Sequence, residues 1–206
     1  MNAVAAPILV VDATAPDAAV LRRAAEVLRR AGAIVFPTET FYGLGADALR
    51  PEAVARVRRL KGRPDDRPLL LLVDSIAMVE SLVTTITPAA RALMERYWPG
   101  PLTLVLPARA LVPVEVTAGT GTVGVRLSSH AVARGLVTAL GGPVTAPSAN
   151  VTGASPPTTV AAALASLGDD VDLALDAGAT AGGPASTVLD AVADPPRVIR
   201  QGAVMP

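Results

Sequence analysis

The chain has 206 residues, of which 51% are hydrophobic and 17% are charged, and its formal net charge is zero. This composition fits a single domain over residues 1–206 with a sizeable buried core, and it argues against intrinsic disorder. The zero net charge provides no general attraction to nucleic acid or to an anionic membrane, and the lack of cysteine together with a single histidine, His130, excludes disulfide bonds and thiolate or multi-histidine metal centres.

Strand-like apolar runs alternate along the chain with segments of helical periodicity. Glycines at 32, 141 and 168 end three of the helical segments, and Pro51 opens another at its first turn. The expected elements in chain order are a strand at 8–11, a helix at 18–31 introduced by Thr14 and Asp17, a strand at 33–36, a helix at 52–60, a strand at 69–73, helices starting at Ser75 and at Thr87, strands at 102–106 and 123–127, a helix at 131–140, a strand at 144–146, a helix at 158–167, and strands at 173–175, 187–189 and 198–200. Because several strands follow one another directly, the sequence predicts an α/β protein of the α+β type, with a twisted mixed β-sheet and flanking helices.

The sequence contains no segment typical of a membrane or a secreted protein. No apolar run approaches the roughly 20 residues that a membrane-spanning helix needs, so we expect no membrane contact. Residues 1–11 have no basic start and soon meet Asp12, which argues against a signal peptide. We therefore expect a cytoplasmic protein.

Lys61 is the only lysine in the chain, although lysine and arginine together number 18. An ammonium is a compact point charge that can follow a phosphate oxygen, whereas a guanidinium is a rigid planar fork. Arg63 and Arg67 lie close to Lys61 in the sequence, so three cations gather within residues 61–67. This cluster predicts a local anion site, while the plainer interpretation is a charged residue at a solvated helix end.

Polar residues also gather beside the ends of expected strands, where rigid scaffolds usually carry function. Hydroxyl, amide or guanidinium groups occur there at Thr38, Thr122, Arg126, Ser148, Asn150, Ser186 and Arg200. Thr122 and Arg126 occupy alternating positions of one strand, so both point to the same face. Such groups can orient a small, multiply anionic ligand such as a nucleoside triphosphate.

One phosphate-binding pattern lacks its required setting. Gly119, Gly121 and Gly124 have the spacing of a dinucleotide-binding loop, but that motif lies between a strand and a helix, and here a strand follows. We interpret these residues as a flexible loop. His130 is interpreted as a cap or packing residue at a helix start, and residues 98–101 as a structural turn.

Together, these segments resemble the YrdC/Sua5 family of threonylcarbamoyl-AMP synthases. The motifs that carry the resemblance occur in the family's order: PTETFYGLG at 37–45, KGRP at 61–64, WPGPLT at 98–103, Val125 with Arg126, APSAN at 146–150 with Gly153, and STVLD at 186–190. The resemblance covers about residues 15–203. It implies a YrdC-like fold with a concave anion-binding cleft, in the short, single-domain form of the family.

The resemblance also implies a reaction in which L-threonine, bicarbonate and ATP give threonylcarbamoyl-AMP and pyrophosphate. The amine of threonine and bicarbonate would form a carbamate, which attacks the α-phosphate of ATP. The product would serve N6-threonylcarbamoyladenosine formation in tRNA through a tRNA threonylcarbamoyl transferase complex, with weak tRNA binding as a further expectation. Mg²⁺ bound together with ATP is the expected cofactor, and no protein metal site is expected.

The resemblance also implies a role for each residue of this sequence that matches a functional position of the family. The expected threonine-binding residues are Thr38, Arg126, Ser148 and Ser186. The expected ATP-binding residues are Lys61, Arg63, Arg67, Thr122, Asn150, Thr158 and Arg200. Lys61, Arg63, Ser148 and Asn150 are the expected catalytic residues. Two positions depart from the family's pattern, because Leu72 stands where some members carry a histidine near threonine, and Arg67 where asparagine is common.

Two other functions stay open at this point. An RNA-binding module without catalysis is disfavoured by the zero net charge and by the low aromatic content of 2%, which leaves few rings for base stacking. A domain that forms carbamoyl-adenylate from carbamoyl phosphate is the second alternative, although such domains normally sit within much larger proteins. Tight, salt-dependent RNA binding without a threonine effect would identify the first, and use of carbamoyl phosphate would identify the second.

Overall fold

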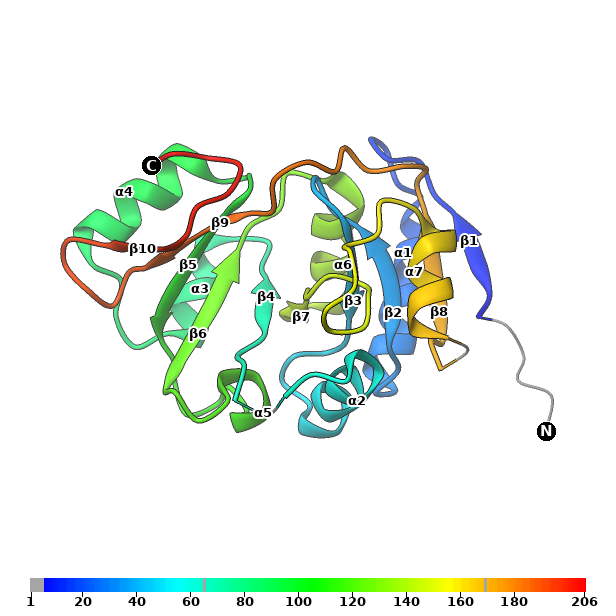
Figure 1. Ribbon diagram of the computed structural model, residues 1–206, viewed down its shortest axis with the longest axis horizontal. Helices are drawn as coiled ribbons and strands as arrows, with labels where there is room; N and C mark the ends of the chain where they lie inside the picture. The colour runs from blue at the N-terminus through cyan, green and yellow to red at the C-terminus, as the bar shows by residue number, and fades with distance from the viewer. Residues whose placement is uncertain (1–5, 65, 169) are drawn as a thin grey trace.

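The computed structural model describes residues 6–64, 66–168 and 170–206. The strands are β1 (Ile8–Val10), β2 (Ile34–Pro37), β3 (Tyr42–Gly45), β4 (Leu70–Leu72), β5 (Leu102–Pro107), β6 (Thr122–Arg126), β7 (Val144–Thr145), β8 (Leu173–Asp176), β9 (Thr187–Asp190) and β10 (Arg197–Arg200). The helices are α1 (Ala18–Arg29), α2 (Pro51–Lys61), α3 (Ile76–Leu82), α4 (Pro88–Tyr97), α5 (Val114–Thr117), α6 (Ala131–Leu140) and α7 (Val160–Leu167). The predicted mixed α/β class is confirmed, and the strands form two separate sheets (Figure 1).

Both sheets mix parallel and antiparallel pairs. The first sheet has the order β1-β8-β2-β3, with β3 antiparallel to β2 and the other pairs parallel. The second sheet has the order β10-β9-β5-β6-β4-β7, in which β9 pairs β5 and β4 pairs β6 in parallel. Strands that are far apart in sequence are therefore neighbours. The chain crosses from one sheet to the other after β3, after β7 and after β8.

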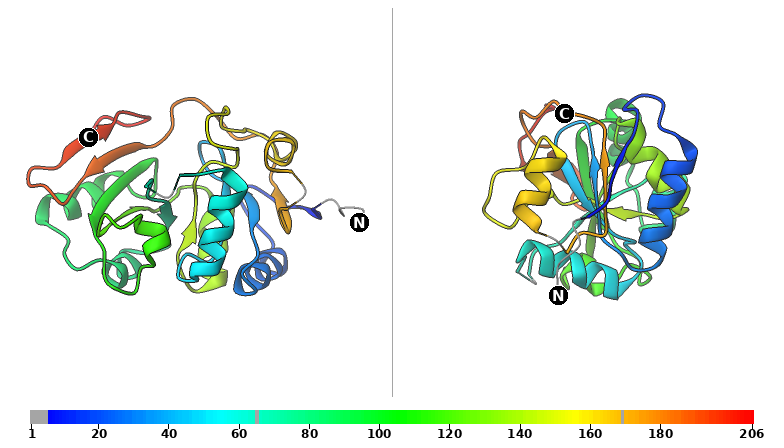
Figure 2. Two further views of the ribbon diagram at one scale, coloured as in Figure 1. Left: turned by 60° about the horizontal axis from the view of Figure 1, so that its bottom comes forward. Right: turned by 90° about the vertical axis from the view of Figure 1, so that its right-hand side faces the viewer.

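Helices cover the first sheet on both faces. Helices α1 and α6 pack together on one face, and α7 lies on the other (Figure 2). The apolar side of α1 places Leu28 in a core cluster with Ile34 of β2 and Leu136 of α6. A second cluster contains Val35 of the first sheet and Leu104 of the second, so one continuous apolar core joins the two sheets.

Several predicted helix starts are confirmed by their capping hydrogen bonds. The hydroxyls of Ser75 and Thr87 accept from backbone amides of α3 and α4, and the His130 imidazole accepts from the Val132 amide of α6. At α1 the cap is Asp17, whose carboxylate accepts from the Ala19 amide at 2.6 Å. Thr14 was also expected to introduce α1, but its hydroxyl donates to Asp12 instead.

Two elements were not predicted from the sequence, namely β3 and the short helix α5. Helix α7 begins at Val160, two residues later than expected, with Thr159 as its cap. No helix in the described part of the chain is long and apolar enough to cross a bilayer. Residues 1–5, which belong to the segment considered for a signal peptide, lie outside the described residues. The single-domain extent over residues 1–206 stays a prediction.

Candidate active site

A cavity of about 560 Å³ lies between the two sheets. Its walls come from the turn between β2 and β3, from β5, β6, β9 and β10, and from the segment that follows β7. The polar residues that line it are Thr38, Thr40, Tyr42, Arg63, Thr103, Thr122, Arg126, Ser148, Ser186 and Arg200. Arginine is the only charged residue type among the described lining residues, so the cavity suits an anion.

Strand β6 forms the floor of the cavity. Thr122, Gly124 and Arg126 all line it, as expected for alternating residues of a strand. The neighbouring strand β5 contributes Thr103 and Val105 in the same way. The predicted shared face of Thr122 and Arg126 is confirmed.

Arg126 is buried, with only 3% of its surface exposed, although it carries a full charge. Its Nη1 lies 3.8 Å from Oε1 of Glu39, and the Ser128 hydroxyl donates to the other carboxylate oxygen of Glu39. Burial lowers the pKa of Arg126, and the charge of Glu39 raises it. The Nε atom of Arg126 has no hydrogen-bond partner among the described residues. A buried guanidinium with an unused donor favours an anionic ligand at this point.

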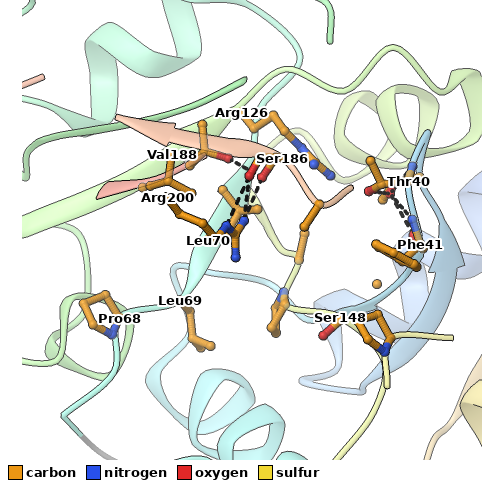
Figure 3. Close-up of a pocket in the computed structure, with 18 of the residues that line it drawn as sticks. Thr40, Phe41, Pro68, Leu69, Leu70, Arg126, Ser148, Ser186, Val188 and Arg200 are labelled. Carbon is orange, nitrogen blue, oxygen red and sulfur yellow. Dashed lines mark hydrogen bonds between the residues drawn. The ribbon is translucent and has the colours of Figure 1, made fainter. Parts of the chain in front are cut away.

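Ser186 and Arg200 lie on the same side of the cavity as Arg126, across from Thr40 and Phe41, as Figure 3 shows. The Arg200 Nη2 donates to the backbone oxygen of Ser186 at 2.8 Å and to its hydroxyl at 3.2 Å. The same hydroxyl lies 3.0 Å from the hydroxyl of Thr103. These three side chains form a connected chain of hydrogen bonds from β10, through the residue just before β9, to β5.

The turn that contains Thr38 supplies two hydroxyls. The Thr38 hydroxyl donates to the Phe41 backbone oxygen at 2.7 Å and accepts from the amides of Thr40 and Phe41. It is therefore largely committed to shaping the turn. The Thr40 hydroxyl lies 3.2 Å from that of Thr38, and Thr40 also lines the cavity. Thr40 thus has the greater hydrogen-bonding capacity left for a ligand.

Lys61 lies beneath the segment after β7 and is not among the residues that line the cavity. Its Nζ donates to the backbone oxygens of Ser148 and Asn150, both at 2.5 Å, and its own backbone oxygen accepts from the Thr152 amide. Burial, and then the charge of Arg63, lower the pKa of Lys61 from 10.5 to about 8. Lys61 therefore holds the loop 148–152 against the end of α2.

The other predicted residues divide between the cavity and its surroundings. Ser148 and Arg63 line the cavity, and Arg63 Nη2 donates to the Pro68 backbone oxygen at 2.8 Å. Burial and two neighbouring arginines lower the pKa of Arg63. Asn150 is buried and its amide donates to the backbone oxygens of Val151 and Ala154, so its side chain shapes the loop. The remaining predicted residues, Arg67 and Thr158, are not part of the cavity lining.

Sequence reasoning did not single out Glu39, Ser128, Thr103 or Thr40 as members of the site. Glu39 and Ser128 are 89 positions apart in sequence, so no local pattern connects them. Thr40 and Thr103 could have been found, because each lies inside a motif already noted, and Thr103 also alternates with the apolar Leu102 and Leu104. Leu72, the departure from the family's pattern, is fully buried in the core and does not line the cavity.

The fold and the cavity define an α/β protein with an arginine-lined cavity between two mixed sheets. The family model for Sua5, YciO and YrdC proteins, described as telomere recombination, matches residues 26–202. A threonylcarbamoyl-AMP synthase of Pyrococcus abyssi is 41% identical over 184 residues, which make up 89% of this chain and 54% of that protein. The chain belongs to the Sua5/YciO/YrdC family, as the resemblance predicted.

Solved structures agree with this assignment. Sua5 of P. abyssi in complex with L-threonine has a TM-score of 0.91 at 39% identity, and the match covers 95% of this chain and 57% of that chain. YciO of Escherichia coli has a TM-score of 0.87 at 26% identity, with 96% of both chains covered. The chain thus spans little more than half the length of its P. abyssi relative.

Proposed function

We propose that this protein is an L-threonylcarbamoyladenylate synthase, a nucleotidyltransferase that converts L-threonine, bicarbonate and ATP to threonylcarbamoyl-AMP and pyrophosphate. The observation that carries the proposal is the buried Arg126, with its unused Nε donor, on the floor of an arginine-lined cavity. The relative from P. abyssi whose structure contains L-threonine has the same fold. A guanidinium pairs well with the carboxylate of an amino acid.

Threonine would occupy the part of the cavity between Arg126, Ser186 and the turn that carries Thr38 and Thr40. Arg126 would pair with its carboxylate, and the hydroxyls of Ser186 and Thr40 would contact its polar groups. Ser148 completes this wall. These residues come from distant parts of the sequence, and the fold brings them together around the cavity.

The triphosphate of ATP would lie toward Arg63, Arg200 and Thr122. An ammonium has three donors, two of which Lys61 uses to hold the loop 148–152. Lys61 does not line the cavity, so its third donor would reach a phosphate oxygen beside Ser148 through a movement of that loop. Asn150 would act through the shape of that loop. Arg67 and Thr158 are proposed as ATP contacts that need movement of their segments, since neither lines the cavity.

The chemistry needs no nucleophile from the protein. The amine of threonine and bicarbonate form a carbamate with loss of one water molecule. A carboxylate oxygen of the carbamate then attacks the α-phosphorus of ATP, and the bond from that phosphorus to the bridging oxygen of the β-phosphate breaks as pyrophosphate leaves. Positioning of the reactants and neutralisation of phosphate charge by the arginines would supply the catalysis. The walls of the cavity would also keep water away from the labile carbamate.

Mg²⁺ is proposed to accompany ATP. The described residues include no group of three or more His, Cys, Asp or Glu side chains that could hold a metal ion. The donor groups that line the cavity are cationic or hydroxyl groups, so the phosphate oxygens of ATP are the ligands that fit Mg²⁺. The ion would supply neutralisation of phosphate charge.

The partners follow from the product. Threonylcarbamoyl-AMP is a mixed anhydride, so a transferase that acts on tRNA would have to consume it promptly. We therefore propose delivery to a tRNA threonylcarbamoyl transferase complex, with at most weak tRNA binding by this chain, because its net charge is zero. A cytoplasmic location stays a prediction.

The test is pyrophosphate release from ATP and Mg²⁺, with and without L-threonine and with and without bicarbonate. Release that needs both substrates supports the proposal, and release that ignores threonine contradicts it. Arg200→Ala should lower the rate strongly, because Arg200 lines the cavity. Arg197→Ala is the matched control, since Arg197 lies at the other end of β10 and does not line the cavity.

A further inference from the structure

We propose that the segment 202–204 positions the threonine-binding wall of the cavity, and that Thr187 and Gly202 are the residues through which it acts. Ser186 provides the hydroxyl of that wall. The inference rests on the proposed function, because it assigns a role to residues outside the cavity in holding Ser186 against the substrate.

Thr187 connects the wall to the segment. Ser186, just before β9, and Val188 of β9 line the cavity, whereas the fully buried Thr187 between them faces away, as alternation along an extended chain requires. The Thr187 hydroxyl donates to the Val204 backbone oxygen at 2.5 Å and accepts from the amides of Gly202 at 3.0 Å and Val204 at 3.2 Å. A hydroxyl has one donor and two acceptor positions. All of them are used on this segment.

Gly202 lets the segment approach closely. A Cβ atom at this position would lie 2.2 Å from the Ala185 backbone oxygen, 2.5 Å from the Ser186 carbonyl carbon and 2.6 Å from the Thr187 nitrogen. These are backbone atoms, which cannot rotate away, so any side chain at 202 would displace residues 185–187. The Ala203 amide also donates to the Ala185 oxygen at 2.9 Å.

Ser186 is consequently fixed from two directions. Its hydroxyl contacts Thr103 and Arg200, whereas its backbone and both chain neighbours contact the segment 202–204. If the segment moves away, the hydroxyl loses its fixed position relative to Arg126 and to bound threonine. Small misplacements of a substrate-positioning group reduce catalytic efficiency strongly.

Substitutions at Thr187 separate positioning from simple folding. Thr187→Val keeps the side-chain shape but removes the hydroxyl, and we expect the KM for L-threonine to rise about tenfold, with a smaller change in kcat. Thr187→Ser restores the hydroxyl and should return the KM to near the wild-type value. Equal KM values in all three proteins, at comparable melting temperatures, would overturn the proposal.

Glycine substitutions test the close approach. Gly202→Ala should raise the KM for threonine, whereas Gly142→Ala is the matched control, because nothing lies within 4 Å of a Cβ there. Hydrogen exchange at the Thr187 amide, which donates to the Pro101 oxygen at 3.0 Å, gives a readout that needs no activity. Exchange of the Thr187 amide should be faster in Gly202→Ala than in the wild type, and unchanged in Gly142→Ala.

The outcomes distinguish this inference from the proposed function. If the wild-type protein releases no threonine-dependent pyrophosphate, the proposed function fails, and the exchange rate at Thr187 alone decides whether segment 202–204 holds the wall. If the wild type is active, faster exchange with an unchanged KM for threonine overturns the positioning role. Faster exchange together with a raised KM supports it.

Discussion

At the scale of single residues, Lys61 acts on the loop 148–152. The sequence singled it out because it is the only lysine, and the structure places its ammonium between two backbone oxygens, with 3% of its surface exposed. A guanidinium has a broader and flatter donor group, so an arginine would not reproduce these two contacts in the same geometry. The rarity of lysine indicated an important position, but the residues that it contacts could be known only from the fold.

We predict that ATP affinity of the free protein falls as pH rises through about 8. Burial, and then Arg63, lower the pKa of Lys61 to about 8, so the ammonium loses its proton in this range. The loss should approach tenfold per pH unit above that value. Calorimetric titration with ATP at a series of pH values measures it. Lys61→Gln should bind more weakly and without this pH dependence, and an unchanged pH dependence in that variant would contradict the assignment.

The same shift predicts a change in stability. The unfolded chain keeps Lys61 protonated up to its ordinary pKa of 10.5, so between about 8 and 10.5 the unfolded state binds more protons than the folded state. The Lys61 term therefore raises the free energy of unfolding, and so stabilises the folded state, as pH rises through this window. The difference in unfolding free energy between wild type and Lys61→Gln at several pH values isolates it.

Glu39 and Arg126 form a buried ion pair whose disruption should be costly. Glu39→Gln keeps the shape of the side chain but leaves the guanidinium without a counter-charge, and we expect the free energy of unfolding to fall by about 3 kcal/mol. Urea denaturation measures the change. Glu80→Gln is the control, because the pair of Glu80 with Arg91 is exposed on both sides and should contribute little. If both substitutions lowered the free energy of unfolding equally, the negative charge of Glu39 would not be needed to stabilise the buried Arg126.

At the scale of elements, periodicity predicted the strands and helices whose pattern is local, and it missed β3. The glycines of β3 resemble those of a turn, so the sequence predicts no strand between the strand at 33–36 and the helix at 52–60. In the structure they make room for the ring of Phe36 on the paired strand, since a Cβ at Gly45 would lie 2.8 Å from it and one at Gly43 3.2 Å from it. Close packing across a strand pair has no signal within one segment.

Gly124 of β6 offers a test of the cavity that leaves the fold intact. It lies between Thr122 and Arg126 on the cavity face, and an added Cβ would make only ordinary contacts, 3.5 Å to a Thr103 methyl carbon. Gly124→Val should therefore keep or raise the melting temperature, because glycine weakens a strand interior. It should weaken threonine or ATP binding at least about tenfold by filling the cavity floor. Unchanged binding in calorimetry would place the ligands elsewhere.

At the scale of the whole molecule, the sequence predicted the α/β class and most of the polar residues that line the cavity. Thr38, Arg126, Ser148 and Ser186 lie in separate motifs, and the family resemblance brought them together before the structure did. The division of the strands into two sheets was not predicted, because it depends on pairings such as β1 with β8 that join distant parts of the chain. Glu39 was missed for the same reason. It lies in the turn after β2, whereas its partner Arg126 ends β6 of the second sheet and its partner Ser128 follows that strand.

Because the cavity walls come from both sheets, ligands that fill it should hold the sheets together. The turn after β2 belongs to the first sheet, whereas Thr103, Thr122 and Ser186 belong to the second or adjoin it. Ligands that bind only the folded state stabilise it by RT ln(1 + [L]/Kd), about 2.7 kcal/mol at a hundredfold excess over Kd. We predict that threonine and MgATP together raise the melting temperature by more than the sum of their separate effects. Gly124→Val should show no such increase, and separate increases that simply add would contradict coupling between the two ligands in this cavity.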